Sequence, residues 1–592
     1  MSQKHLMSGN EAIAQGAWEA GCAFGSGYPG TPSSEILPVL TKLGREGGRE
    51  GGSAGFQPAY TEWAVNEKGA LEAAAGASLT GARCLVTMKH VGLNVAADPF
   101  FTLSYTGVKG GLVIVCADDP QMHSSQNEQD SRHFARAAKV PMLEPADAQE
   151  ALEFTRLAFE LSERHDTPVL LRVTTRLSHS DGVVVTGARE QPDAACLPTP
   201  EPEKYVMIPA RARARRKLMA ERTAAIRAWN ETATVNEIIA GSPEIGLIAS
   251  GIALQYAREV LPEAAVLKLG MTWPLPEQLI RSFAATVQML YVIEELDPYL
   301  TESIRALGVT VEPLPESLQL GELSPARVRA GLQGRDYAPQ VLADLPARPP
   351  QLCPGCPHRG VFHILRKLKL FVTGDIGCYT LGTLPPLQAL HTCLCMGAGI
   401  GMVHGINQAC GGKQKAVAVI GDSTFMHSGM TGLLNIVYNQ SPSVVIILDN
   451  STTAMTGGQD HPGTGATLSG RPGRQVDLEA LCRGAGVAHV TTFEPADLKV
   501  TEAAIREALA SDGPAVLIGR RPCVLITREH GAPRVIDEAL CVQCGACLRL
   551  GCPAISARVL GDGKKQPVID TSLCMGCTLC AQVCPKDAII QA

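Results

Sequence analysis

The sequence has no long apolar run, no excess of positive charge and no export signal. No apolar stretch reaches the about 18 residues that a membrane-spanning helix requires. No signal peptide opens the chain, so we expect a cytoplasmic protein with no membrane partner. The formal net charge of -6 provides no general basic surface for a phosphate backbone, which argues against nucleic acid as a partner.

The composition describes a globular chain of several domains that is rich in cysteine. Of the 592 residues, 45% are hydrophobic and 19% are charged. Because a single hydrophobic core rarely extends beyond about 250 to 300 residues, we expect three or four domains. Eight of the 20 cysteines lie in the last 52 residues. In a chain without export signals, such clustering indicates metal binding more than disulfide bonds.

The N-terminal part of the chain has the pattern of an α/β domain. Apolar runs at 84–88, 112–116 and 168–173 predict buried strands, and an Ala- and Glu-rich stretch at 62–78 predicts a helix. A Gly- and Pro-rich loop covers 22–35. Polar loops follow the first two strands. Since open α/β sheets bind ligands at the carboxyl ends of their strands, we expect a site there.

The middle of the chain carries less chemistry. Residues from about 190 to 240 are Pro-rich and then charged, which predicts a linker and a surface helix. We interpret the basic run at 211–217 as a solvated face of that helix rather than an anion-binding site. Strand-like runs at 246–251, 266–270 and 289–295 predict a smaller α/β domain.

A βαβ unit is predicted around the sequence Gly421-Asp422-Ser423. Apolar strands at 416–420 and 444–448 flank a stretch with helical spacing, and they lead into Asp422 and Asn450. The carboxylate and the carboxamide therefore follow neighbouring parallel strands. Mg²⁺ prefers such oxygen ligands and takes only one or two from a protein. The alternative is a plain strand-to-helix turn in which Asp422 caps a helix.

Residues 530–592 contain two cysteine runs of the bacterial ferredoxin type. Each run has three cysteines separated by two residues and a fourth that precedes proline. In this pattern the fourth cysteine ligates the cluster of the other run. One [4Fe-4S] cluster is thereby assigned to Cys541, Cys544, Cys547 and Cys584. The other is assigned to Cys574, Cys577, Cys580 and Cys552. A pair of zinc sites is the weaker alternative.

The Gly-Asp-Ser motif and the later Asn resemble the signature of thiamine-diphosphate-binding folds. The resemblance implies that Asp422, Asn450 and the backbone carbonyl of Thr452 hold Mg²⁺ against the diphosphate. It also implies that the loop after the Asn covers the thiazolium ring. The implied cofactor-binding residues of this half are Gly421, Asp422, Ser423, Asn450, Thr452 and Met455.

The N-terminal stretch resembles the pyrimidine-binding domain of 2-oxoacid:ferredoxin oxidoreductases. Its loop Tyr28-Pro29-Gly30-Thr31-Pro32-Ser33 matches a family motif that places the Thr, here Thr31, near the substrate. Glu67 matches the Glu that contacts N1′ of the cofactor's aminopyrimidine. We predict that Glu67 is the catalytic acid/base, a role that needs a carboxyl in a mostly apolar pocket. The alternative is an exposed helix carboxylate, with Glu62 and Glu72 as close competitors.

One position departs from the pyruvate-specific relatives. In those relatives an Arg after the strand equivalent to 112–116 takes the substrate carboxylate, whereas this chain has Asp118 and Asp119. An acidic pair would repel a carboxylate, so we expect other residues to place the substrate. The candidates are Lys89, His90 and His123, each of which could equally be structural.

The stretch from 351 to about 525 opens with a cysteine pair. This pair, Cys353 and Cys356, could be half of a zinc knuckle. It also resembles the motif that begins a proximal [4Fe-4S] cluster in pyruvate:ferredoxin oxidoreductases, where a Gly-Cys and a Pro-Cys complete the set. The implied ligands of this third cluster are Cys353, Cys356, Cys378 and Cys523. We interpret Cys393 and Cys395 as part of a Gly-rich helix start that approaches the cofactor.

Taken together, the parts resemble the alpha subunit of indolepyruvate:ferredoxin oxidoreductases along nearly the whole chain. The implied fold class is α/β, with two thiamine-diphosphate-binding domains of doubly wound parallel sheet, a transketolase C-terminal-like α/β domain, and a C-terminal two-cluster ferredoxin-like α+β domain. The expected order is a pyrimidine-binding domain at 1–190, a linker and surface helix at 191–240, the transketolase-like domain at 241–345, the diphosphate-binding domain at 351–525 and the ferredoxin domain at 530–592.

The resemblance implies oxidative decarboxylation of aryl pyruvates to aryl-acetyl-CoA and CO₂. The implied cofactors are thiamine diphosphate, Mg²⁺ and the iron–sulfur clusters, with coenzyme A as cosubstrate. The implied partners are a smaller beta subunit, present with this chain in two copies each, and ferredoxin as electron acceptor. Three alternatives stay open: another 2-oxoacid as substrate, a non-oxidative thiamine-diphosphate decarboxylase with an accessory ferredoxin domain, and a pure electron-carrier subunit.

Overall fold

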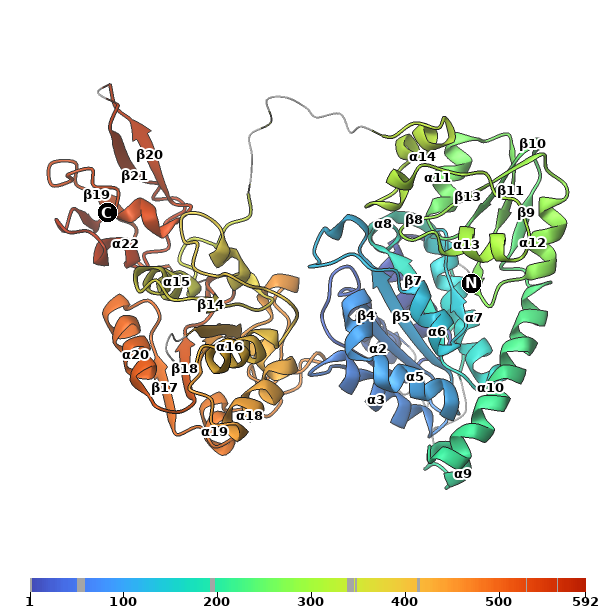
Figure 1. Ribbon diagram of the computed structural model, residues 1–592, viewed down its shortest axis with the longest axis horizontal. Helices are drawn as coiled ribbons and strands as arrows, with labels where there is room; N and C mark the ends of the chain where they lie inside the picture. Colours follow the sequence, from blue (N-terminus) through green and yellow to red (C-terminus); the bar gives the residue numbers. More distant parts are fainter. Residues whose placement is uncertain are drawn as a thin grey trace. The chain divides into compact units, whose positions relative to one another are not determined.

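The computed structural model describes residues 3–50, 59–191, 197–337, 345, 349–411, 416–528, 530–561 and 563–592. Of residues 47–50 it describes only the backbone. The chain divides into two compact units, Met1–Leu342 and Ala343–Ala592 (Figure 1). Among the described residues, no helix has both the length and the apolar character that crossing a membrane requires.

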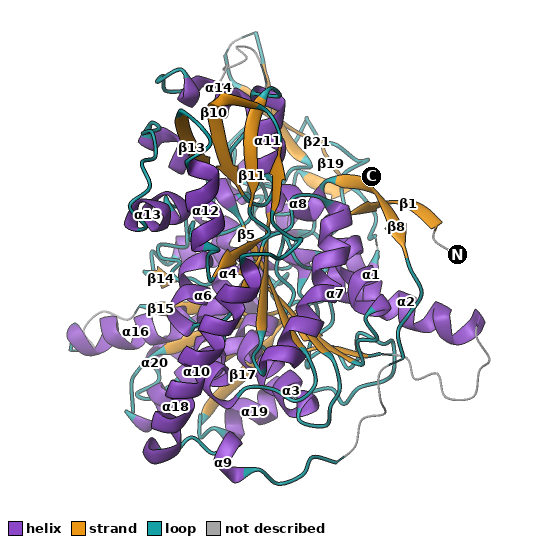
Figure 2. Cartoon of the chain, turned by 90° about the vertical axis from the view of Figure 1, so that its right-hand side faces the viewer, coloured by secondary structure: helices purple, strands orange, loops and turns teal. Residues whose placement is uncertain are grey.

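The first unit is built on a seven-stranded sheet with the order β12-β6-β7-β5-β4-β2-β3. All neighbouring strands are parallel except β12 and β6. Helices α4 and α6 lie on one side of this sheet and α1 and α7 on the other (Figure 2), so the central strands are buried on both faces. The strands are β2 (Phe24–Gly27), β3 (Tyr60–Trp63), β4 (Cys84–Lys89), β5 (Leu112–Asp118), β6 (Met142–Leu143), β7 (Val169–Thr174) and β12 (Met271–Trp273).

The helices of this part begin where the sequence supplies caps. Ser8 caps α1, Asn66 caps α3 and Asp147 caps α7, each accepting a backbone N–H with its side-chain oxygen. Strand β1 (Gln3–Ser8) pairs with β8 (Asp181–Thr186) at the edge of the unit. The helices are α1 (Gly9–Glu19), α2 (Ile36–Glu50), α3 (Glu67–Ser78), α4 (His90–Val95), α5 (Ala97–Thr106), α6 (Arg132–Ala138), α7 (Ala148–His165) and α8 (Thr175–His179).

Helix α10 (Pro209–Asn230), which follows the short α9 (Pro202–Tyr205), carries the basic run. The prediction of a solvated face is wrong for part of it. Arg215 donates hydrogen bonds to the carbonyls of Tyr105 (2.7 Å) and Thr106 (2.9 Å) at the end of α5. The last carbonyls of a helix have no partner within the helix, so a cation that reaches them is stabilised there.

A second, four-stranded sheet with the order β13-β10-β11-β9 follows in the same unit. Along β10, Leu247 and Ala249 face a core with α11, whereas Ile248 faces a core with α12 and α13. The alternation places helices on both faces. The elements are β9 (Glu237–Ile239), β10 (Ser242–Ala249), α11 (Ala253–Val260), β11 (Ala264–Lys268), α12 (Glu277–Ala284), β13 (Met289–Ile293), α13 (Tyr299–Ala306) and α14 (Pro325–Leu332).

Strand β12 links the two sheets of the first unit. It lies between β11 and α12 in sequence, yet it pairs antiparallel with β6 of the seven-stranded sheet, Met271 opposite Leu143. A stretch expected to belong wholly to the smaller domain therefore contributes a strand to the larger one.

The second unit contains a parallel five-stranded sheet with the order β14-β15-β16-β18-β17. Helices α15 and α20 pack on one face, and α16, α18 and α19 pack on the other. The strands are β14 (Val372–Thr373), β15 (Val417–Gly421), β16 (Val444–Asp449), β17 (His489–Phe493) and β18 (Ala515–Arg520). The helices are α15 (His358–Lys367), α16 (Ala398–Ala409), α17 (Asp422–Thr424), α18 (Met430–Tyr438), α19 (Leu478–Gly484), α20 (Leu498–Ala510) and α21 (Val524–Thr527).

The terminal segment of the second unit has little regular structure. Its elements are two antiparallel pairs, β19 (Arg534–Ile536) with β22 (Ile589–Gln591) and β20 (Ile555–Val559) with β21 (Lys565–Ile569), and the short α22 (Leu579–Gln582). Its apolar residues Leu550 and Leu579 belong to the same core as Leu352 and Phe362, which lie before and within α15. The terminal segment and the sheet therefore share one hydrophobic core.

Candidate functional site

The predicted metal ligands lie at the carboxyl ends of two adjacent parallel strands. Asp422 follows β15 and Asn450 follows β16, and their exposed fractions are 2% and 6%. The Asp422 carboxylate accepts backbone N–H groups from Ser423 (2.8 Å) and Ser451 (2.9 Å). The βαβ connection thus brings the two side chains to one edge of the sheet, where their oxygens form a donor set suited to a hard cation.

A buried histidine, which the sequence analysis did not select as a site residue, lies beside both Asp422 and Asn450. His358 Nε2 is 3.5 Å from Asn450 Nδ2. Burial lowers the pKa of His358 to about 4, against the opposing charge of Asp422. One imidazole therefore lies close to both the carboxylate and the carboxamide.

The loop after Asn450 folds back toward the same place. Thr453 Oγ1 donates to Ser423 Oγ (2.8 Å), and the loop is closed by a hydrogen bond from the Thr453 N–H to the carbonyl of Gln459 (2.9 Å). Thr452 is 3% exposed, whereas Met455 is 51% exposed. A second unpredicted histidine, His461, is buried with its Nε2 3.3 Å from a carboxylate oxygen of Asp422.

Asp375 is a further buried carboxylate that sequence reasoning missed. It follows β14 and accepts N–H groups from Gly397 (2.9 Å) and Gly399 (3.1 Å) at the start of α16. Burial raises its pKa to about 6. The Asp375 carboxylate therefore binds the Gly-rich start of the helix. The thiol of Cys393 donates to the backbone carbonyl of Asp375 (3.6 Å). No sequence spacing signals these contacts, since they depend on how β14 and α16 pack.

The four cysteines of the predicted third centre are electrostatic neighbours. Burial raises the pKa of Cys356 to about 12, and Cys353 and Cys378 contribute in the same direction. Burial likewise raises the pKa of Cys378 to about 11, with further contributions from Cys353 and Cys523. The N–H of Cys523 donates to the carbonyl of Asn450 (3.0 Å), so the backbone of this group adjoins the predicted metal ligand.

The eight terminal cysteines surround two cavities in the groups that the spacing predicts. One cavity is lined by Cys541, Cys544, Cys547 and Cys584. The other is lined by Cys552, Cys574, Cys577 and Cys580. Burial raises the pKa of Cys580 to about 12, with Cys577, Cys574 and Cys552 contributing. Each fourth cysteine thus lies with the three cysteines of the other run.

In the first unit, Glu67 is the first residue of α3 and only 4% exposed. A Cβ on Gly92 would lie 2.6 Å from Glu67 Oε1, so α4 packs closely against this carboxylate. Glu72, by contrast, is exposed and pairs with Lys68. The other competitor, Glu62, lies on β3, so the helix predicted at 62–78 begins only at Glu67. Of the three carboxylates, Glu67 is the buried one.

Lys89, at the end of β4, lies near Glu67 and the predicted threonine loop. Burial lowers the pKa of Lys89 to about 8, although the charges of Asp119 and Glu67 oppose this. Its Nζ donates to the Ser124 carbonyl (2.9 Å), and Ser124 Oγ donates to the Thr31 carbonyl (3.1 Å). One cationic side chain therefore lies among the predicted site residues.

The other two candidate substrate-binding residues, His90 and His123, make contacts within the protein. His90 is fully buried and its Nε2 is 3.2 Å from the carbonyl and side-chain oxygens of Asn127. His123 points outward and lies 3.3 Å from Glu322. The acidic pair is engaged structurally, since Asp118 binds Arg172 (2.7 Å) and Asp119 accepts from Ser125 Oγ (2.6 Å).

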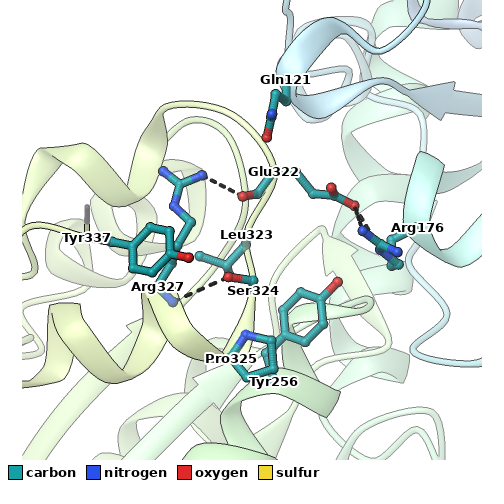
Figure 3. A pocket seen from close by; sticks show the side chains of 9 residues that line it. All are labelled: Gln121, Arg176, Tyr256, Glu322, Leu323, Ser324, Pro325, Arg327 and Tyr337. Carbon is teal, nitrogen blue, oxygen red and sulfur yellow. Dashed lines mark hydrogen bonds and ion pairs between the residues drawn. The ribbon is translucent and has the colours of Figure 1, made fainter. Parts of the chain in front are cut away.

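A separate pocket of about 600 Å³ opens elsewhere in the first unit (Figure 3). Its walls come from α8, α11, α14 and neighbouring loops, and an ion pair joins the lining residues Arg176 and Glu322 (2.8 Å). The predicted site residues do not line it. Its lining residues are Gln121, Arg176, Tyr256, Glu322, Leu323, Ser324, Pro325, Arg327 and Tyr337.

Family models match three parts of the chain. Residues 15–239 match the thiamine-diphosphate-binding region of pyruvate flavodoxin/ferredoxin oxidoreductases. Residues 375–518 match the C-terminal binding domain of thiamine pyrophosphate enzymes, and residues 534–591 match a 4Fe-4S dicluster domain. Together they define the class as a thiamine-diphosphate-dependent, iron–sulfur-containing oxidoreductase of 2-oxoacids.

Full-length relatives narrow the class. The chain is 40% identical to indolepyruvate oxidoreductase subunit IorA of Archaeoglobus fulgidus, over 99% of this chain and 97% of the relative. It is 38% identical to the protein of that name from Pyrococcus abyssi, over 99% and 96%. The chain belongs to the indolepyruvate oxidoreductase subunit IorA family. A solved 2-oxoglutarate:ferredoxin oxidoreductase from Magnetococcus marinus is 16% identical with a TM-score of 0.45, over 56% of this chain and 65% of that one.

These findings confirm the predicted family, the fold class and the assignment as an oxidoreductase. They support thiamine diphosphate and iron–sulfur clusters as cofactors. The designation of the relatives as a subunit implies a partner chain. The roles of individual residues, the number of clusters, Mg²⁺ and coenzyme A remain predictions.

Proposed function

We propose that this chain, with a smaller partner subunit, catalyses the oxidative decarboxylation of aryl pyruvates to aryl-acetyl-CoA and CO₂ and passes the electrons to ferredoxin. The observation that carries the proposal is the backbone hydrogen bond between Cys523 and Asn450. It joins a cysteine group directly to a candidate metal ligand. The proposed site of carbon chemistry and the proposed electron exit would therefore adjoin.

Asp422, Asn450 and the carbonyl of Thr452 would hold Mg²⁺ against the cofactor's diphosphate. Their fit to this role rests on the donor set, which is made of buried hard oxygens that leave other coordination positions to phosphate and water. When bound, thiamine diphosphate supplies the electron sink for loss of CO₂. His358 and His461 lie against two of these ligands and would fix their orientation, as neighbouring groups do in metal sites.

Glu67 would exchange a proton with N1′ of the aminopyrimidine. Its burial at the start of α3 supports this role over that of a solvated carboxylate. Thr31 would contact the substrate. Lys89 is the candidate for the substrate carboxylate, because it is the cation that lies with Glu67 and the Thr31 loop.

The cysteine groups would hold three [4Fe-4S] clusters. Thiolates are the ligands that such clusters require. Two cavities, each lined by four terminal cysteines, and the mutual effects of the first four cysteines on their pKa values support this proposal. The first cluster would be held by Cys353, Cys356, Cys378 and Cys523. The inner terminal cluster would be held by Cys552, Cys574, Cys577 and Cys580, and the outer one by Cys541, Cys544, Cys547 and Cys584.

The names of the relatives point to indolepyruvate as the substrate. The test is an anaerobic assay of the chain with its partner subunit, in which viologen reduction is followed with indolepyruvate, phenylpyruvate or pyruvate, with and without coenzyme A. We expect coenzyme-A-dependent reduction that is fastest with the aryl substrates. Faster turnover of pyruvate would reject the aryl assignment, and aldehyde release without dye reduction would reject oxidation. Size measurement of the complex tests the expectation of two copies of each subunit.

A further inference from the structure

A buried arginine connects two of the cysteine groups. Arg359 lies in the first turn of α15 and is 2% exposed, which makes it one of the two largest fully buried side chains of the described chain. Among the described residues no carboxylate forms an ion pair with it. A buried cation without a counter-charge is costly, so its retention in this core calls for an anionic neighbour.

The guanidinium of Arg359 donates to two separate segments of the chain. Nη2 donates to the carbonyls of Leu352 (2.7 Å) and Cys353 (3.1 Å), at the start of the first cysteine group. Nη1 donates to the carbonyls of Leu550 (2.7 Å) and Gly551 (2.6 Å), which immediately precede Cys552. Figure 1 shows α15 beside the terminal segment.

The charge of Arg359 acts on both groups of thiols. Its side chain lines the cavity formed by the inner terminal cysteines. Its Nη1 donates to the carbonyl of Gly551, the neighbour of Cys552, and its Nη2 donates to the carbonyl of Cys353 itself. Because the guanidinium is shielded from water, this interaction is weakly screened. A cluster with four thiolates is anionic and becomes more so on reduction, so a nearby fixed cation stabilises its reduced form.

We propose that Arg359 is a positioning residue for electron transfer that fixes the inner terminal cluster against the first cluster and raises the reduction potential of both. The step it serves moves one electron: the first cluster is oxidised, the inner cluster is reduced, and no bond forms or breaks. This inference rests on the proposed function, because it assumes that iron–sulfur clusters occupy both cysteine groups.

The test uses the full chain with its partner subunit, purified anaerobically, and measures iron content and the cluster potentials by redox titration with electron paramagnetic resonance. In Arg359→Met we expect the reduction potential of the inner cluster to fall by at least about 59 mV. For a one-electron couple this corresponds to an about tenfold decrease in the equilibrium constant for reduction. The first cluster should shift in the same direction and the outer cluster should not. Arg359→Lys, which keeps the charge, should restore most of the potential.

The matched control is Arg549→Met. Arg549 is an exposed arginine in the short turn that ends at Leu550, and its charge is screened by water. Its loss should leave all three potentials unchanged. A purely structural role for Arg359 would instead lower iron content or stability without shifting the potential of clusters that remain.

The outcomes separate this inference from the proposed function. An unchanged inner potential in fully loaded Arg359→Met overturns the inference. If Arg359→Met loses its iron, the test rests on Arg359→Lys, which keeps the charge. The role of the charge is refuted if the inner-cluster potential of Arg359→Lys falls as far as we predict for Arg359→Met. Wild-type protein with about 8 iron atoms per chain in place of about 12 would refute the first cluster, and with it the bridging part of the inference. The inner potential would still test the charge effect separately.

Discussion

The candidate sites at the carboxyl ends of the strands and those at the cysteine cavities are assembled from the sequence in different ways. Asp422 and Asn450, or Glu67 and Lys89, are distant in sequence and are brought together by parallel strands and their helices. These four are buried polar side chains at the carboxyl ends of strands or at a helix start. The terminal cysteines, by contrast, are grouped by short local spacings, and Cys547 and Cys580 belong to the hydrophobic core itself. We therefore expect a size-conserving change at the carboxyl end of a strand to disturb the fold less than the loss of a core cysteine.

The largest effect should come from Asp422→Asn. Losing a direct ligand should weaken cofactor binding by more than the about 10- to 100-fold typical of neighbouring residues in metal sites, and activity should fall below detection. Thiochrome fluorescence after desalting measures the retained cofactor. The melting temperature without cofactor should fall only slightly, because the carboxamide oxygen can replace one of the two acceptors that Asp422 offers to backbone N–H groups and the apolar core of the sheet is unchanged. Asp497→Asn, in the exposed cap of α20, is the control and should keep the cofactor.

Glu67→Gln should lower the rate by about 10²- to 10⁴-fold, the range expected when a group that transfers a proton is lost. Cofactor retention should change little, since the side chain keeps its size. Glu72→Gln removes an exposed carboxylate from the same helix and should have almost no effect. Equal losses of rate in Glu67→Gln and Glu72→Gln would contradict a catalytic role for the buried carboxylate.

Cys577→Ser should separate electron exit from carbon chemistry. We expect the inner cluster to be lost, iron to fall by about four atoms per chain, and ferredoxin reduction to drop at least tenfold while cofactor binding persists. Because this group lies in the shared core, the melting temperature should also fall. The exposed Cys410, outside the three groups, gives the control Cys410→Ser, in which iron content should stay constant.

Lys89 gives a pH dependence. Since burial lowers its pKa to about 8, the side chain is charged below this pH and loses its charge as the pH rises through it. If Lys89 binds the substrate carboxylate, KM should increase by about tenfold between pH 7 and 9, following the protonated fraction. In Lys89→Met, KM should be high at pH 7 and independent of pH. Lys68→Met, on the exposed face of α3, should keep the wild-type profile.

The smallest effect concerns the contact between the terminal segment and the sheet. Gln582 accepts from the N–H of Leu498 (2.9 Å) and donates to the carbonyl of Ala496 (2.7 Å). Its loss in Gln582→Ala should reduce the free energy of unfolding by about 1 kcal/mol, measured by denaturant titration of the apo chain. A loss several times larger would mean that polar contacts, rather than the shared core, hold the segment.

Much of this architecture could be predicted from local patterns. The apolar runs before Asp422 and Asn450 predicted adjacent parallel strands, which the structure has. The C-x-x-C spacing predicted how the terminal cysteines would group, and they lie around two cavities in those groups. In both cases the relevant information lies within one supersecondary unit.

Other features depend on packing between distant elements and had no local signal. His461 reaches Asp422 and Asp375 binds the start of α16 only because separate loops meet at the edge of one sheet. Arg215 was predicted to be solvated from its charged neighbours, yet it docks on α5. Charge alone does not tell whether unsatisfied carbonyls lie within reach of an arginine.

The three residues of β12 have a consequence for any attempt to divide the protein. They cover β6, which would otherwise be an unpaired edge of the seven-stranded sheet. A fragment that stops near residue 240 would expose the backbone hydrogen-bonding groups of that edge to other chains. We therefore expect such a fragment to self-associate, and a cut after Leu342 to be the first that yields a well-behaved N-terminal piece.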